Sequence, residues 1–253
     1  MRKLPRARSK PAQMWEETAV VDPTRGRLGA LAAAATVVAI LSALVAACGS
    51  VGATSPLPIM PLGDSITDGF NIPGGYRIDL EDDLIAAGLP PDFLGTLQNG
   101  PAALADRNHE GHSGWRIDEI HASVDGWLTT YQPEVVLLLI GTNDVIQDYQ
   151  VSTAPSRLAA LLDRIHAVRP TAKILLSTIP PLANAADNAQ AATYNDAIPG
   201  LVQARASQGR PISFVDAGRR LTLSQLADGV HPNASGYSSL ADSWRDGINW
   251  LGG

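Results

Sequence analysis

Residues 134–140 form the stretch that most constrains the fold of this 253-residue chain. Their sequence, E-V-V-L-L-L-I, has six apolar residues in succession and no polar alternation. A strand with this pattern is covered on both faces, as a central strand of a parallel sheet is between two layers of helices. The run ends at Gly141-Thr142-Asn143-Asp144, so polar side chains follow the strand directly.

Four further strand-like runs alternate with helical patterns. We predict strands at 57–62, 92–97, 134–140, 173–178 and 212–216, and helices at 76–87, 116–128, 153–168, 185–206 and 234–250, with a break near Pro199. This alternation predicts an α/β fold with a five-stranded parallel sheet and helices on both faces. Residues 98–114 are predicted to form a polar loop. In open sheets of this class, ligands bind beyond the carboxyl ends of the strands.

The body of the chain is acidic, whereas its first 47 residues are basic. Residues 1–47 contain seven Lys/Arg and three Asp/Glu, a net charge of +4, and the rest of the chain has a net charge of −10. With 45% hydrophobic and 17% charged residues, the composition is that of a globular protein. We expect one domain at 56–253, and its acidity argues against a nucleic-acid partner.

Residues 1–47 resemble a signal or anchor segment with a basic n-region. Residues 28–47 are uncharged and apolar, follow Arg25 and Arg27, and lead to Cys48, the one cysteine of the chain. The sequence before Cys48 is similar to a bacterial lipobox, in which cleavage precedes the cysteine and its thiol is lipidated. A signal peptide cleaved elsewhere and an uncleaved transmembrane anchor are the alternatives, and Met14 is an alternative start to Met1. We expect a linker at 48–55 before the domain. All three interpretations place the domain outside the cytoplasmic membrane, either held at its outer face or secreted.

Ser65 is the first candidate catalytic residue. Residues 59–69 read I-M-P-L-G-D-S-I-T-D-G, so Ser65 follows an apolar strand and Gly63. A serine at the carboxyl edge of a sheet can act as a nucleophile when a base takes its proton. An ordinary turn is the alternative, because glycine, aspartate and serine are common turn residues.

His231 is the candidate base among five histidines. It stands in A-D-G-V-H-P-N, a loop before the last predicted helix and three residues after Asp228. That spacing lets the Asp228 carboxylate accept a hydrogen bond from one ring nitrogen while the other faces Ser65. His121 and His166 fall on predicted helices as surface or boundary residues, and the segment around His231 also suits a plain turn.

An acyl-transfer site also needs donors for the developing oxyanion. We predict that these are the backbone N–H groups of Ser65 and Gly114 and the side-chain amide of Asn143, which follows the central strand. A helix N-cap for Asn143 and a plain loop glycine for Gly114 are the alternatives. His109, Glu110 and His112 lack the H-E-x-x-H spacing of a zinc site, so we expect no metal and no other cofactor.

The candidate residues lie in four blocks that resemble those of the SGNH (GDSL-type) hydrolases: Gly63-Asp64-Ser65, Gly114, Gly141-x-Asn143-Asp144 and Asp228-x-x-His231. The resemblance implies a flavodoxin-like three-layer α/β/α sandwich, with Ser65 as nucleophile, His231 as base and Asp228 as its acid. It also implies that Ser65, Gly114 and Asn143 form the oxyanion hole. The serine does not stand in G-x-S-x-G, which argues against the α/β-hydrolase fold.

A narrower resemblance is to the acetylxylan esterases of carbohydrate esterase family 3. It is carried by M-P-L-G-D-S-I-T-D-G, G-G-Y-R, D-F-L-G-T, H-E-G-H-S-G-W and G-T-N-D. It implies a serine esterase that removes acetyl groups from polysaccharide; a lysophospholipase or thioesterase of the same fold is the alternative. Tyr76, Arg77 and Trp115 are candidate substrate contacts, with core packing for Trp115 and a surface ion pair for Arg77 as alternatives.

Overall fold

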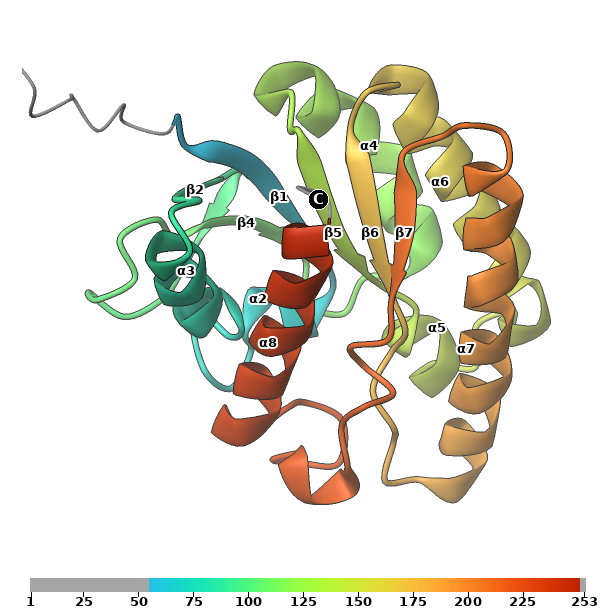
Figure 1. Ribbon diagram of the computed structural model, residues 1–253. Coiled ribbons are helices and arrows are strands. Elements are labelled where there is room, and N and C mark those ends of the chain that lie inside the picture. Colours follow the sequence, from blue (N-terminus) through green and yellow to red (C-terminus); the bar gives the residue numbers. More distant parts are fainter. Residues whose placement is uncertain (1–54, 251–253) are drawn as a thin grey trace, which may run out of the picture. The chain divides into compact units, whose positions relative to one another are not determined.

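A seven-stranded sheet forms the centre of the molecule, as the computed structural model shows for residues 55–250 (Figure 1). The strand order is β3-β4-β1-β5-β6-β7, and β2 pairs with β1. All pairings are parallel except that of β3 with β4. The strands are β1 (Leu57–Gly63), β2 (Pro91–Phe93), β3 (Leu97–Gln98), β4 (Asn108–Gly111), β5 (Val135–Leu139), β6 (Lys173–Ser177) and β7 (Ile212–Val215).

Helices cover both faces of this sheet, so the predicted α/β layering is confirmed. Figure 1 shows α3 and α8 in front of the sheet, with α4 and α6 behind it. The α-helices are α2 (Ser65–Asp68), α3 (Arg77–Ala86), α4 (Ile117–Tyr131), α5 (Thr142–Ile146), α6 (Ala154–Val168), α7 (Ala185–Ala206) and α8 (Ala234–Trp250). Single 3-10 turns lie at Val151–Thr153 and Leu223–Gln225.

The apolar run that constrained the fold is the central strand β5. All five of its residues are buried, and it pairs with β1 on one side and β6 on the other. The helix α4 packs its buried residues, which recur every three or four positions, against the sheet: Ile117, Ile120, Val124 and Leu128. The continuous apolar run of β5 and the helical periodicity of α4 thus determine which of their residues enter the core.

The predicted count of five parallel strands is wrong, because residues 92–111 are arranged differently. The expected strand at 92–97 is divided into β2 and β3, and the predicted loop at 98–114 contains β4. The sequence of β4, N-H-E-G, is polar and carries no apolar alternation. Its partner is the end of β1, where Leu62 lies opposite Glu110 and Gly63 opposite Gly111.

The predicted break near Pro199 is also wrong, because α7 runs without interruption from Ala185 to Ala206. Proline removes one backbone donor and normally disfavours a helix interior. Here Tyr194, Ile198 and Val202 are buried on the inner side of α7, and this packing keeps the helix continuous.

The carboxyl ends of the two central strands lead into the short helices that carry the candidate residues. β1 is followed by α2 and β5 by α5, and Figure 1 shows both helices at the same end of the sheet. The signal or anchor segment at 1–47, Cys48 and most of the predicted linker lie outside the described residues. Within residues 55–250, no helix is long and apolar enough to span a bilayer.

Candidate active site

Ser65 is held at the junction of β1 and α2. Asp64 caps the helix, and its side chain accepts a hydrogen bond from the N–H of Ile66 at 3.0 Å. A Cβ on Gly63 would lie 2.1 Å from the carbonyl oxygen of Leu139, so only glycine lets β1 approach β5 this closely. Ser65 as a whole is 6% exposed, so most of the residue is buried at this junction.

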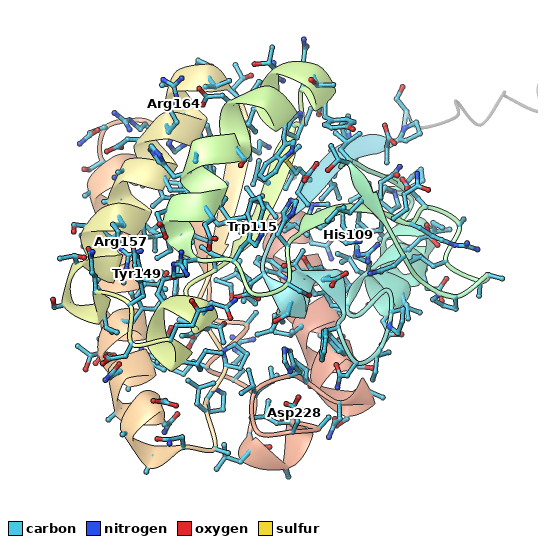
Figure 2. All side chains as sticks on the ribbon, turned by 180° about the vertical axis from the view of Figure 1, so that it is seen from behind. His109, Trp115, Tyr149, Arg157, Arg164 and Asp228 are labelled. Carbon is cyan, nitrogen blue, oxygen red and sulfur yellow. The ribbon has the colours of Figure 1, made fainter. Side chains whose placement is uncertain are left out.

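The His231 ring joins Ser65 to Asp228. Its Nε2 lies 2.9 Å from the Ser65 hydroxyl, and its Nδ1 lies 2.7 Å from Oδ2 of Asp228. An ionised carboxylate only accepts hydrogen bonds, so Nδ1 carries the proton and Nε2 is left to accept from Ser65. Figure 2 shows Asp228 on the loop before α8.

Asp228 is held as a carboxylate by its own loop. Burial acts to raise its pKa, but hydrogen bonds from the backbone N–H and ring of His231 and the N–H of Val230 outweigh it and lower the pKa to about 2. The two backbone N–H groups meet Oδ1 at 2.8 and 3.0 Å. Asp228 is thus ionised at every pH at which an esterase would be assayed.

The loop that carries Asp228 and His231 is fastened to the α2–α3 connection. Leu226 and Pro232 form an isolated antiparallel bridge, and the Asn71 side chain donates to the Pro232 carbonyl at 3.0 Å. The Phe70 ring lies against the His231 ring, with centroids 5.0 Å apart, yet Phe70 is 62% exposed. An exposed aromatic ring therefore borders the candidate site, and sequence reasoning missed it because its position depends on the fold of a distant loop.

The structure also brings the two remaining predicted oxyanion donors together. Asn143 is buried in the first turn of α5, and one N–H of its amide donates to the Trp115 carbonyl at 2.9 Å. Gly114 precedes Trp115 and has a φ of +85°, a conformation that suits glycine. The Asn143 amide has a second N–H that this contact does not use.

Two of the predicted substrate contacts are wrong, because Tyr76 and Arg77 are both 0% exposed. The Arg77 guanidinium donates to the Arg107 carbonyl at 2.8 Å and to Oδ1 of Asn99 at 2.6 Å, so it stabilises the interior and forms no surface ion pair. The Tyr76 ring packs near Trp244. Neither residue can touch a substrate.

Trp115 belongs to an aromatic stack beside the same loop. Its ring centroid lies 4.1 Å from that of His112 and 6.2 Å from that of Trp127, and the His112 and Trp127 centroids are 4.8 Å apart, so the three rings contact one another in pairs. Trp115, which is labelled in Figure 2, is half-buried, and substrate contact by its exposed part stays a prediction.

The remaining histidines of the 109–112 segment bind protein groups. His112 Nε2 lies 2.8 Å from Oε2 of the buried Glu110. His109 accepts from the N–H of Gly111 at 3.1 Å, and burial lowers its pKa to about 3. Across residues 55–250, no three His, Cys, Asp or Glu side chains are grouped so as to hold a metal ion.

Comparison with known proteins extends over most of the chain. The model of the GDSL-like lipase/acylhydrolase family matches residues 62–238. A multidomain esterase of Ruminococcus flavefaciens is 33% identical over 239 residues, which cover 83% of this chain and 31% of that protein. A putative endoglucanase X of Acetivibrio thermocellus is 32% identical over 133 residues, which cover 51% of this chain and 55% of that protein. The chain therefore spans about a third and about half of these two relatives.

Two solved structures are similar over nearly their whole length. A family 3 carbohydrate esterase of Clostridium thermocellum has a TM-score of 0.71 and 34% identity, with 79% of this chain and 100% of that chain covered. A carbohydrate esterase family 3 protein from Talaromyces cellulolyticus has a TM-score of 0.69 and 30% identity, with 77% and 97% covered. Together with the family match, these findings show that the chain belongs to the GDSL-like lipase/acylhydrolase (SGNH) family of carboxylic ester hydrolases.

Proposed function

We propose that the protein removes acetyl groups from polysaccharide by a Ser-His-Asp mechanism. The observation that carries this proposal is the continuous contact from Ser65 through His231 to Asp228, at 2.9 and 2.7 Å. The substrate class is supported by similarity to the two family 3 carbohydrate esterases. The exposed Phe70 ring beside His231 also favours a sugar, because aromatic faces suit the apolar faces of sugar rings.

The proposed reaction has two steps. The Ser65 oxygen attacks the ester carbonyl while Nε2 of His231 takes its proton, and Asp228 stabilises the resulting imidazolium. The N–H groups of Ser65 and Gly114 and the amide of Asn143 hold the oxyanion. His231 then returns the proton to the departing sugar alcohol, which leaves an acetyl ester on Ser65. A water molecule, deprotonated by His231, attacks this ester and releases acetate with the free Ser65 hydroxyl.

Ser65→Ala tests the mechanism. We expect it to lower kcat for p-nitrophenyl acetate by about 10⁴-fold or more, with an unchanged circular dichroism spectrum. Ser152→Ala, on the 3-10 turn before α6, is the matched control and should retain full activity. If Ser65→Ala turned over p-nitrophenyl acetate as fast as wild type, Ser65 would not be the nucleophile and the proposed mechanism would be wrong.

The substrate class needs its own test. We expect acetate release from acetylated xylan and faster turnover of p-nitrophenyl acetate than of the octanoate ester. Preference for octanoate would favour the lysophospholipase or thioesterase alternative. If acetate were released from acetylated chitooligosaccharide but not from acetylated xylan, the proposed mechanism would stand and the substrate would be a different polysaccharide.

A further inference from the structure

Gly114 has no side chain whose packing could hold its backbone in place. It is exposed, and a Cβ added to it would meet no atom within 4 Å. Glycine has the widest backbone freedom of any residue, so hydrogen bonds must fix its two dihedral angles. An oxyanion donor has to be oriented before the reaction begins, since reorientation during the reaction would reduce the stabilisation that it provides.

The peptide that joins Gly114 to Trp115 is held at both of its polar groups. The Trp115 N–H donates to the His112 carbonyl at 3.1 Å, and the Gly114 carbonyl accepts from Nε2 of Gln147 at 3.0 Å. The preceding residue is held as well, because the Ser113 hydroxyl donates to Oδ2 of Asp68 at 2.6 Å. Gln147 therefore supplies the side-chain contact that restrains Gly114 itself.

Gln147 lies one helical turn beyond Asn143, so the two amides share a face. The Asn143 amide donates to the Trp115 carbonyl, and the Gln147 amide donates to the Gly114 carbonyl. Two consecutive carbonyl groups of the loop are thus bound by side chains that follow β5. This connects the loop to the central strand of the sheet, all of whose residues are buried.

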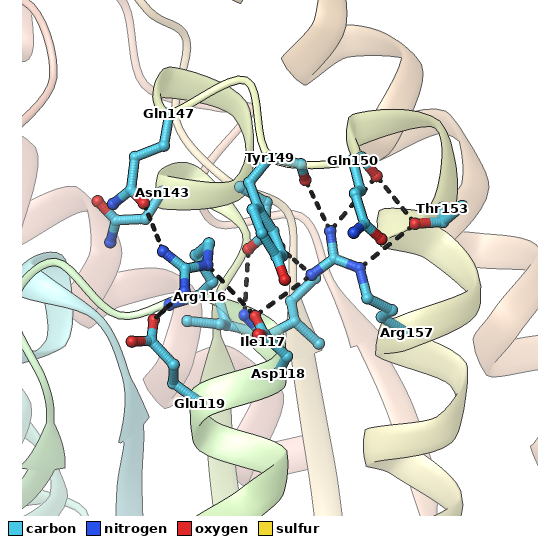
Figure 3. A network of polar contacts seen from close by, with 12 residues as sticks. Arg116, Ile117, Asp118, Glu119, Asn143, Gln147, Tyr149, Gln150, Thr153 and Arg157 are labelled. Carbon is cyan, nitrogen blue, oxygen red and sulfur yellow. Dashed lines mark hydrogen bonds and ion pairs between the residues drawn. The ribbon is translucent and has the colours of Figure 1, made fainter.

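Arg116 fixes the orientation of the Gln147 amide, as Figure 3 shows. Its guanidinium donates to Oε1 of Gln147 at 2.7 Å. Arginine has no acceptor, so it binds only the oxygen of the amide and turns the nitrogen toward the Gly114 carbonyl. The guanidinium itself lies over the Tyr149 ring, 4.2 Å from its centroid, and pairs with Asp118 and Glu119 at 3.4 Å.

We propose that Gln147 is a positioning residue for the oxyanion hole, which it holds through the Gly114 carbonyl and under the control of Arg116. The inference rests on the proposed serine mechanism, because it gives the Gly114 N–H a role in the reaction. Gln147 touches no reacting atom. Its effect falls on kcat, since oxyanion stabilisation acts in the transition state and leaves the bound ester unaffected.

Three variants of the full chain separate the contacts. Gln147→Met has a side chain of similar size but forms neither the hydrogen bond with Arg116 nor the one with the Gly114 carbonyl. Gln147→Glu keeps the acceptor for Arg116 but sets a carboxylate oxygen against the Gly114 carbonyl. Arg116→Met leaves the Gln147 amide free to rotate. Gln98→Met is the matched control, because it removes an exposed amide that binds Asn108 in the β3–β4 pair.

We expect both Gln147 variants to lower kcat for p-nitrophenyl acetate by about 10-fold or more, below the 10²- to 10³-fold typical of losing an oxyanion donor itself. KM should change by less than about twofold. The inhibition constant of a boronic acid that forms a tetrahedral adduct with Ser65 should rise in parallel with the fall in kcat/KM, which a general loss of stability would not produce. Arg116→Met should have a smaller effect, and Gln147→Met/Arg116→Met should be no worse than Gln147→Met alone.

Wild-type kcat in Gln147→Glu would overturn the inference, as would unchanged boronic acid inhibition in Gln147→Met. Additive effects in the double variant would equally contradict the chain of contacts from Arg116 to Gly114. If Ser65→Ala is inactive while Gln147→Met has normal kinetics, this inference fails and the serine mechanism stands. If Ser65→Ala is fully active, the mechanism fails first.

Discussion

Asp228 and His231 could be predicted at the level of single residues because their contact is local. They are three positions apart, and within the described residues the hydrogen bonds that orient Asp228 come from residues 230 and 231. Arg77 could not be predicted in the same way. Its partners Asn99 and Arg107 are 22 and 30 positions away, and a charged residue is ordinarily exposed unless such partners meet it.

Replacing Asp228 by asparagine tests the assigned tautomer. The amide oxygen of the new side chain would still accept from the backbone N–H groups of Val230 and His231, but its NH₂ would face Nδ1 of His231. The ring would then carry its proton on Nε2 and could not accept from Ser65. We expect Asp228→Asn to lower kcat by about 10³- to 10⁴-fold with an unchanged melting temperature. Activity close to wild type would show that the carboxylate does not set the tautomer.

Asp64 gives a pH-dependent prediction of stability. Burial raises its pKa to about 6, although the hydrogen bond from the Ile66 N–H acts to lower it. Well below the ordinary aspartate pKa of 3.8 the carboxyl group is protonated in both the folded and unfolded states. Between about pH 4 and pH 6 the unfolded state loses this proton while the folded state keeps it, so the free energy of unfolding falls, and the fall ends once the folded state also ionises above about pH 6.

Asp64→Asn should abolish this loss, because asparagine still accepts from the Ile66 N–H and never ionises. Relative to wild type, we expect the variant to gain on the order of 2–3 kcal/mol between pH 4 and pH 7.5. Urea denaturation at the two pH values measures the gain. Asp82→Asn, at an exposed position, is the control and should follow wild type. If the free energy of unfolding changed equally for Asp64→Asn and wild type between the two pH values, the raised pKa of Asp64 would be contradicted.

At the scale of secondary structure, the elements with strong periodicity could be predicted and the polar ones could not. β5 and α4 are specified by their own residues. β4 is a strand because β1 offers a free edge and because the Glu110 carboxylate is satisfied by Thr96 and His112. Those partners come together only in the folded molecule, so the N-H-E-G sequence carries no signal of its own.

The central strand should be the most sensitive element to truncation of a side chain. Leu137 is fully buried and lies opposite Pro61 of β1 and Leu175 of β6. We expect Leu137→Ala to lower the free energy of unfolding by about 2–5 kcal/mol, from lost burial and the cavity left behind. Ile85→Ala, at a residue that is 53% exposed, is the control and should change it by less than about 0.5 kcal/mol. A loss below about 1 kcal/mol for Leu137→Ala would contradict the central role of β5.

At the scale of the whole molecule, we propose that the protein is a lipoprotein at the outer face of the cytoplasmic membrane. The proposal is supported by the basic n-region, the apolar run at 28–47 and the small residues before Cys48. We expect Cys48→Ala to move the protein from the membrane fraction to the soluble fraction of expressing cells. Ser50→Ala is the control and should stay with the membrane. Retention of Cys48→Ala in the membrane would favour an uncleaved anchor.

The distance along the chain between Ser65 and His231 also has a consequence for synthesis. The two residues are separated by 166 positions, whereas the acid and base are made together in one short loop. A growing chain presents its serine early, but no base can reach that serine until the loop before α8 has been made. The nucleophile is therefore chemically idle on the ribosome. Because the acid and base follow β7, the ability to cleave esters arises only after all seven strands of the described sheet have been made.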